Sequence, residues 1–289
     1  MSASFLIEQY RYLFRSFPQR KKLWHKLYLA YELSNLPVKY ARLSTALSRP
    51  APTPNCDGRK CVVVLLSHNR PQNLQILVRG ALQNRFVSKV VVSNSNPKFR
   101  IADWVRVRDP RLRLFDESKK TLPGRRFELA DQEDGGYFLC IDDDIFLTPT
   151  QWAKLFMCLL QDESVPHGIT GHIYDRAATF SNGSHFHHFE FVEKEVDVLI
   201  GAYAFTRNHL REVFALAQAL EMGPLSSVGN GEDILLSFAG AGRSRIHDIG
   251  RPLLCASTSL PGIALWKTRE VFWEERERLY ERIRGARYA

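Results

Sequence analysis

The chain has 289 residues, of which 45% are hydrophobic and 25% are charged. This length suffices for one large domain or two small ones, and the charged fraction is ordinary for a globular protein. Lys and Arg outnumber Asp and Glu by 40 to 31, which leaves a net charge of +9. A basic balance favours anionic partners such as nucleotides, phospholipid surfaces, acidic polysaccharides or nucleic acid, and does not choose among them.

No apolar stretch is long enough to span a bilayer, and the first residues lack the apolar run of a signal peptide. The five cysteines form no CxxC pair, and their odd, scattered set favours a reducing compartment. We therefore expect a cytoplasmic protein, either soluble or bound peripherally at the inner face of the membrane.

Residues 1–48 form a segment of their own. Apolar and aromatic residues recur there at helical spacing, with Arg and Lys between them, and Pro18 interrupts the pattern. We predict two basic amphipathic helices, which could lie on an anionic membrane, mediate a dimer or pack on their own domain. Residues 49–59 contain alternating prolines and predict a linker, so that the main domain covers 60–289.

The main domain begins with alternating strands and helices. Continuous apolar runs at 61–66 and 87–93 predict strands buried on both faces, and 72–83 predicts a helix between them. This is a βαβ unit, which should be parallel and right-handed. Strands are also expected at 112–115 and 137–141, and helices at 124–132 and 149–160. The alternation predicts an α/β architecture.

The second half of the chain is less regular. Its apolar runs and helical patterns predict strands at 168–174, 189–192 and 197–205, and helices at 207–221, from 231 onward and at 268–284. Glu232 and Asp233 stand in the first turn of the helix after Gly231, where the helix dipole favours acids.

Three carboxylates, Asp142, Asp143 and Asp144, follow the apolar strand 137–141 directly. Three adjacent charges cannot lie in a strand core without partners, so they must lie where the strand opens into a loop. Carboxylate oxygens suit hard divalent cations, whose remaining ligands are often phosphates. The triplet predicts either a metal held against a phosphorylated ligand or a solvated acidic turn.

Polar loops also follow the first two strands, at Ser67–Arg70 and Asn94–Asn96. In a parallel sheet the carboxyl ends of the strands share one edge, where such folds bind ligands. Amide and hydroxyl groups suit a base and ribose, and the acidic triplet suits a metal. The order of the loops therefore predicts a nucleoside-diphosphate site.

Four segments, in this order, resemble the exostosin-like α-N-acetylhexosaminyltransferases, a family with the GT-A fold. They are Ile141–Asp144, Leu199–Phe205, Asn230–Ile234 and Gly262–Arg269. The resemblance covers about residues 60–275 and leaves the N-terminal helices outside. It implies a GT-A (Rossmann-like nucleotide-diphospho-sugar transferase) fold, to which the helices predicted above add an N-terminal helical extension. It also implies a UDP-sugar donor, Mn²⁺ or Mg²⁺, a glycan or polysaccharide acceptor, and retention of anomeric configuration.

The resemblance also implies roles for the acids and for one arginine. Asp144 would be the main metal ligand, and Asp142 and Asp143 would hold the ribose, the donor sugar or a metal-bound water, with Asp142 as second metal ligand. Asp233 would face the reacting sugar, with Glu232 as the second candidate. Arg269 would offset the negative charge that develops on the leaving group.

Other residues would bind the donor. Arg125 and Arg126 would reach the diphosphate or the base, and Trp266 would either stack on a sugar or anchor the core. The remaining candidates for donor binding are Ser67, Asn69, Arg70, Asn94 and Lys267.

Several histidines lie outside this pattern. His247 follows a predicted strand, as a metal-binding His does in many GT-A enzymes, although the exostosin-like branch does not require it. His185, His187 and His188 suggest zinc, but no Cys stands near them, and an acceptor loop or a solvated loop remains open.

The leading prediction is a metal-dependent glycosyltransferase, and two other classes are possible for such a chain. An aspartyl phosphotransferase is disfavoured because Phe146 stands two residues after Asp144, where the DxDxT pattern does not allow it. A catalytically silent nucleotide- or polyanion-binding module stays open as the alternative. Nucleic acid is not expected, because the basic residues are scattered and no patch interleaves them with exposed aromatics.

Overall fold

The computed structural model describes residues 3–16, 23–178, 185–255, 258, 266 and 270–288. Two helices come first, α1 (Ala3–Ser16) and α2 (Leu23–Ser48). The first half of the main domain contains β1 (Cys61–Ser67), α3 (Pro71–Leu82), β2 (Val87–Asn94), β3 (Leu112–Asp116), α4 (Arg125–Asp131), β4 (Tyr137–Ile141), β5 (Ile145–Phe146) and α5 (Pro149–Gln161). The second half contains β6 (His167–Tyr174), β7 (Phe186–Glu190), β8 (Lys194–Val196), β9 (Val198–Thr206), α6 (Arg207–Ala219), α7 (Glu232–Ser237), β10 (Ser244–Ile246), β11 (Leu253–Leu254) and α9 (Phe272–Tyr288).

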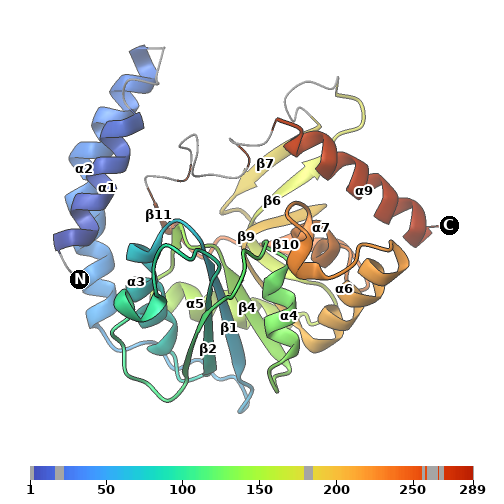
Figure 1. The fold of residues 1–289 in the computed structure, drawn as a ribbon, viewed down its shortest axis with the longest axis horizontal. Helices are drawn as coiled ribbons and strands as arrows, with labels where there is room; N and C mark the ends of the chain where they lie inside the picture. Colours follow the sequence, from blue (N-terminus) through green and yellow to red (C-terminus); the bar gives the residue numbers. More distant parts are fainter. Residues whose placement is uncertain are drawn as a thin grey trace.

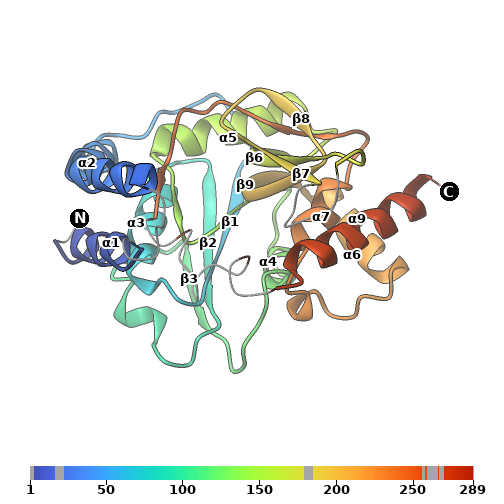
Figure 2. The same ribbon diagram turned by 90° about the horizontal axis from the view of Figure 1, so that it is seen from above.

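A twisted sheet forms the centre of the molecule, with the strand order β3-β2-β1-β4-β9-β6-β10-β8 and β7 paired to β6 (Figure 1). Strands β3, β2, β1 and β4 are parallel, and β9 runs antiparallel between β4 and β6. Helices α3 and α5 cover one face, and α4, α6, α7 and α9 cover the other (Figure 2). The predicted α/β fold class is therefore confirmed.

The continuous apolar runs are strands buried on both faces, as their composition predicts. In β1, Val63 and Leu65 pack with α3 and α5, whereas Val62 and Val64 pack on the opposite face with α4. All four are at most 2% exposed. Helices on both sides of the sheet leave only the strand ends open to ligands.

The predicted strand at 189–192 was misplaced. The strand β7 covers Phe186–Glu190 and pairs antiparallel with β6, with Phe189 opposite Gly171. Phe191 ends it with a φ of 53°, a left-handed conformation that a strand cannot continue through. The apolar pattern of Phe189 and Phe191 therefore marks the end of the strand and the turn after it.

The two predicted N-terminal helices are present, and they pack on the main domain. Phe5 stacks on Tyr40 with ring centroids 5.8 Å apart and meets Phe146 of β5 edge-to-face at 5.2 Å. Gln9 Nε2 donates to Asn73 Oδ1 of α3 at 3.4 Å. None of the helices in the described ranges combines the length and apolar character that a membrane span requires.

Candidate functional site

The loops after β1 and β2 lie side by side at one edge of the sheet. Ser67 is the register partner of Asn94, and Ser95 N donates to Ser67 O at 3.1 Å. His68 Nδ1 lies 3.1 Å from Ser95 Oγ, and Asn96 Nδ2 donates to His68 O at 2.6 Å. These bonds join the two polar loops into one wall beside the acidic triplet, which follows the adjacent strand β4.

One side of the triplet is held by the first turn of α3. Arg70 Nη1 lies 2.6 Å from Asp143 Oδ1, and Arg70 Nη2 lies 3.1 Å from Asp144 Oδ2. Asn73 Nδ2 donates to the main-chain oxygen of Asp143 at 2.7 Å. Burial raises the pKa of Asp144 to about 6, and the positive charge of Arg70 opposes that rise. The arginine thus favours ionised carboxylates in a site where water is scarce.

The other side of the triplet faces α4 and α7. Arg126, itself 5% exposed, donates from Nη2 to Asp142 Oδ1 at 2.8 Å and from Nη1 to the Tyr203 hydroxyl at 2.8 Å. The same Nη2 lies 3.9 Å from Glu232 Oε1. The side chain of Asp142 is 40% exposed, so it stays accessible to a ligand while Arg126 holds it. Arg126 therefore connects the triplet to the predicted catalytic acids.

The acids of α7 lie at a sharply turned helix start. Gly231 precedes them with a φ of 98°, and a Cβ there would meet Leu279 Cδ2 at 2.5 Å, so only glycine fits. Asp233 is 8% exposed and forms a two-bond pair with Arg276 of α9, with both nitrogen–oxygen distances 2.9 Å. Such a planar pair fixes the orientation of the carboxylate.

Arg276 was not among the predicted site residues, although the sequence contains a signal for it. Residues 276, 279, 280 and 283 follow the helical spacing i, i+3, i+4 and i+7, and the last three are Leu279, Tyr280 and Ile283 of the core. An arginine in an apolar stripe must have a buried partner. That partner is Asp233, which lies 43 residues away in the sequence. The helical pattern alone did not identify it.

The raised pKa of Glu232 can be tested by measuring how the free energy of unfolding depends on pH. Burial and the neighbouring Asp233 raise its pKa from 4.5 to about 7, whereas Arg126 and Arg276 oppose the rise. Between pH 4.5 and 7 the folded state then binds more protons than the unfolded state, so the free energy of unfolding falls as pH rises. We expect Glu232→Gln to stabilise the fold relative to wild type by about 2 kcal/mol more at pH 8 than at pH 5.

Denaturant unfolding of both proteins at the two pH values measures this difference. Asp134→Asn, at an exposed position near the end of α4, serves as the matched control and should show no such difference. An equal effect of Glu232→Gln at both pH values would mean that Glu232 titrates normally.

Two of the other predicted donor-binding residues, Arg125 and Asn94, are engaged with partners outside the acidic triplet. The guanidinium of Arg125 pairs with Glu117 at 2.8 Å and Glu128 at 2.9 Å, and not with the triplet. Asn94 uses its amide to hold its own loop, donating to Asn96 O, Phe99 O and Asp116. Trp266 is 40% exposed. Lys267 and Arg269 lie outside the described residues, so their roles stay predictions.

His247 points away from the triplet to other partners. Its Nε2 lies 2.7 Å from His167 Nδ1, and its Nδ1 lies 2.7 Å from Glu193 Oε2. In the strand order, β9 and β6 stand between β4 and the strand that His247 follows, β10. Within the described ranges, no group of three or more His, Cys, Asp and Glu side chains is arranged around a common metal position.

The acidic edge nevertheless fits a divalent cation that shares its shell with a phosphate. Asp142 and Asp144 carry hard oxygen donors on one loop, and Mg²⁺-type sites commonly use only one or two carboxylates besides the substrate phosphates. Arg70 and Arg126 hold these carboxylates from opposite sides. The donor chemistry of the loop therefore agrees with the predicted metal, whose ligands remain a prediction.

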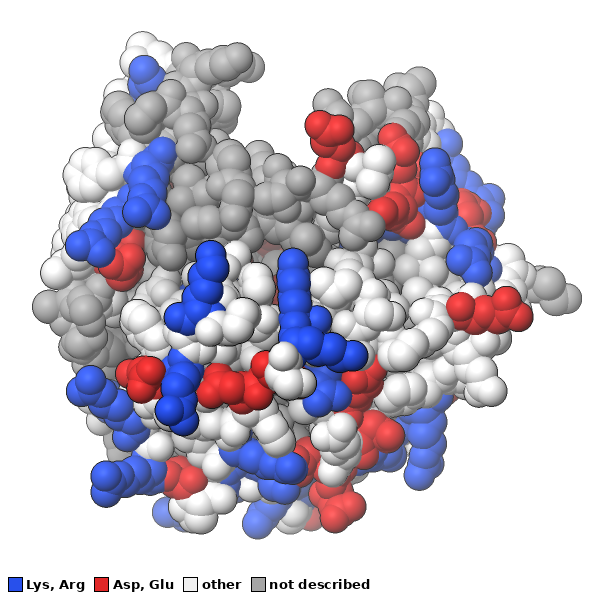
Figure 3. Space-filling model, viewed as in Figure 1, with Lys and Arg blue, Asp and Glu red and all other residues white. Residues whose placement is uncertain are grey.

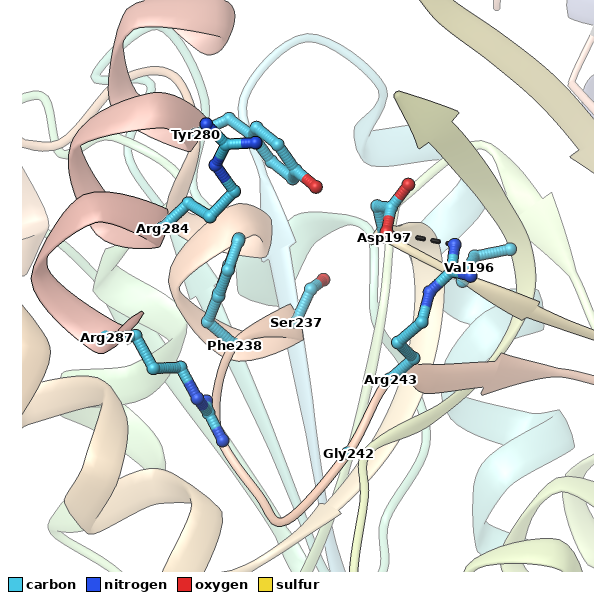
Figure 4. Close-up of a pocket in the computed structure, with 9 residues that line it drawn as sticks. All are labelled: Val196, Asp197, Ser237, Phe238, Gly242, Arg243, Tyr280, Arg284 and Arg287. Carbon is cyan, nitrogen blue, oxygen red and sulfur yellow. Dashed lines mark ion pairs between the residues drawn. The ribbon is translucent and has the colours of Figure 1, made fainter. Parts of the chain in front are cut away.

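A separate cavity of about 110 Å³ lies between α7, α9, the end of β8 and the segment that leads into β10 (Figure 4). Its lining includes Arg243, Arg284 and Arg287, and Arg243 pairs with Asp197 at 2.9 Å. None of the triplet carboxylates lines it. A nucleotide needs roughly 300 Å³ or more, so this cavity is not the candidate site.

The fold and the site define an α/β protein whose sheet has a cluster of acidic residues at the carboxyl ends of its parallel strands. No family model and no curated protein matches the chain. Among solved structures, the chain is similar to GalNAc-T7 with UDP, GalNAc and Mn²⁺, with 11% identity and a TM-score of 0.49 over 68% of this chain and 44% of that one. The chain thus spans less than half of the GalNAc-T7 chain.

Two further solved structures are similar. The mannosyltransferase PcManGT from Pyrobaculum calidifontis, in complex with GDP-Man and Mn²⁺, is 14% identical, with a TM-score of 0.46 over 87% of this chain and 68% of that one. A CMP:2-keto-3-deoxy-manno-octonic acid synthetase complexed with CTP is 13% identical, with a TM-score of 0.38 over 56% of this chain and 83% of that one.

Proposed function

We propose that this chain is a metal-dependent glycosyltransferase that moves a sugar from a UDP-sugar to a hydroxyl group of a glycan or polysaccharide. The observation that carries the proposal is the line of ion pairs along one sheet edge. Arg70 holds Asp143 and Asp144, Arg126 holds Asp142 beside Glu232, and Arg276 holds Asp233. These ion pairs would connect the region that binds the diphosphate to a pair of acids that could face the sugar.

The first part of the proposed site binds the diphosphate. Asp144 and Asp142 would hold Mn²⁺ or Mg²⁺, which when bound supplies the positive charge that stabilises a diphosphate leaving group. Ser67, Asn69 and Arg70, at the end of β1 and in the loop after it, would bind the nucleoside, and Asn94 would support them by holding the neighbouring loop in place. The role of Arg70 is to keep Asp144 ionised and oriented, because burial alone favours the neutral acid.

The second part acts on the sugar. Asp233 would stabilise positive charge at the anomeric carbon or orient the donor hydroxyls, and Arg276 keeps its carboxylate in one orientation. Glu232 is the second candidate for this role. The N-acetylhexosaminyl specificity and the retention of configuration rest on the resemblance to the exostosin-like enzymes and are part of the proposal.

Calorimetric titration with UDP and several UDP-sugars, with Mn²⁺ and with EDTA, tests the proposal. Metal-dependent binding of one UDP-sugar, followed by release of UDP when acceptor glycans are supplied, is the expected result. Binding without any turnover would favour the catalytically silent nucleotide-binding alternative. Failure of every UDP-sugar to bind a folded sample would overturn the proposed donor, and GDP- and CMP-sugars would then be titrated in the same way.

A further inference from the structure

The helices α1 and α2 expose a row of large apolar side chains. These residues are Ile7 (51% exposed), Phe14 (63%), Leu23 (72%), Leu27 (63%), Tyr31 (59%) and Val38 (49%). We call this set the outer stripe. Six of the large apolar side chains that are exposed on the described part of the molecule thus lie on two helices. Exposed apolar residues scattered singly need no explanation, but a row of them does.

The outer stripe follows helical spacing. Steps of four, four and seven residues connect Leu23, Leu27, Tyr31 and Val38, so they share one side of α2. Ile7 and Phe14 are seven residues apart on α1 and share a side in the same way. The stripe is therefore a continuous feature along each helix.

Packing against the rest of the protein does not use this stripe. The two helices pack on each other through a small cluster that contains Leu13, Leu29 and Leu36. They pack on the main domain through Phe5, Leu43 and Leu47, which belong to the core of α3, α5 and the sheet. Different faces of the helices thus serve the internal contacts, and the stripe is left on the outside.

Positive charge is concentrated in the same segment. Residues 1–48 contain eight Lys and Arg against two Glu, so they carry six of the nine net positive charges of the chain. Arg11 and Arg15 on α1 and Arg42 on α2 are exposed. Basic side chains are visible at the upper left of Figure 3, over the two helices.

We propose that the outer stripe docks α1 and α2 onto an anionic phospholipid surface. A helix that combines an apolar face with flanking Lys and Arg lies in the plane of a bilayer interface and gains affinity from anionic lipids. A second copy of the chain is a poorer occupant, because two segments of the same high positive charge would be brought together. Docking of the stripe does not depend on the proposed enzymatic function.

The buried face of α1 contacts the elements that hold the acidic triplet. Gln9 of α1 donates to Asn73, and Asn73 donates to the main chain of Asp143. The two helices project beyond the sheet on the side of β11, which pairs with β5 directly after the triplet (Figure 1). The two helices therefore lie close to the candidate site through their inner faces, and the outer stripe is on other faces.

Co-sedimentation of the full chain with lipid vesicles tests this proposal. We expect binding to phosphatidylcholine vesicles that contain about a quarter phosphatidylglycerol, weaker binding in high salt, and little binding to phosphatidylcholine alone. The double variant Leu27→Glu/Tyr31→Glu should lose binding by about tenfold or more, because charged groups are costly in the interface. Val192→Glu changes an apolar residue of 41% exposure outside the stripe and should bind like wild type.

Two outcomes would overturn the proposal. The first is unchanged vesicle binding by a double variant whose circular dichroism and melting temperature match wild type. The second is a dimer, seen by light scattering, that the double variant dissociates while wild type binds no vesicles; the stripe would then be an interface between two copies.

Discussion

Asp144→Asn is expected to remove metal-dependent binding of the donor and to lower turnover by about a hundredfold to a thousandfold. The amide has nearly the same shape as the carboxylate but is neutral, so it is a poor ligand for a hard cation. Arg70 keeps its shorter pair with Asp143, at 2.6 Å, so the loop should hold its conformation. Calorimetry with a UDP-sugar in the presence of Mn²⁺, together with UDP release, measures both effects.

The matched control for this variant is again Asp134→Asn, which removes an exposed carboxylate before the start of β4, whereas the triplet follows its end, and which should leave binding and turnover unchanged. Wild-type donor affinity and turnover in a folded Asp144→Asn protein would exclude Asp144 as a metal ligand. Asp142, the other predicted ligand, would then be tested in the same way.

Asp233→Asn is expected to keep donor binding and to lower turnover by about a hundredfold or more. If Asp233 faces the reacting sugar, the variant loses stabilisation of the transition state. Donor binding is kept, because the triplet's contacts with the diphosphate remain intact. The change also leaves the buried Arg276, which is 4% exposed, without a charged partner. Removing one member of a buried pair commonly costs about 3–5 kcal/mol of stability, so the variant should also melt at a lower temperature.

A double variant separates these two effects. Asp233→Asn/Arg276→Met removes the unpaired positive charge and should recover much of the lost stability, since apolar replacement of a buried ion pair is often tolerated. Turnover should stay low in the double variant. If turnover returned together with stability, Asp233 would serve the fold alone, and Glu232 would become the leading catalytic candidate.

Much of the site's framework was predictable from residue patterns. Long β-branched runs at 61–66 and 87–93 can be stable only between two layers, so they indicate central strands. Once the strands are parallel, their carboxyl ends must meet at one edge, which brings Ser67, Asn94 and Asp142 together. The pattern of apolar residues shows which strands are buried on both faces of the sheet. Knowing these strands was enough to predict where the polar loops after them lie.

The pairing of charges was decided by tertiary packing. Arg125 and Arg126 are adjacent in sequence, yet they point in different directions from α4, so that Arg126 pairs with Asp142 while Arg125 pairs with Glu117. Arg276 reaches Asp233 only because α9 packs across the start of α7. No local pattern specifies which distant helix supplies a partner.

The N-terminal segment shows the same division. Its sequence determined two helices and a strongly basic charge, since both follow from spacing and composition. Which faces are buried was decided by the tertiary structure: Phe5 enters the core beside Tyr40 and Phe146, and Leu27 does not. An amphipathic pattern states that a face seeks apolar surroundings, and only the position of the neighbouring elements determines whether the protein itself provides them.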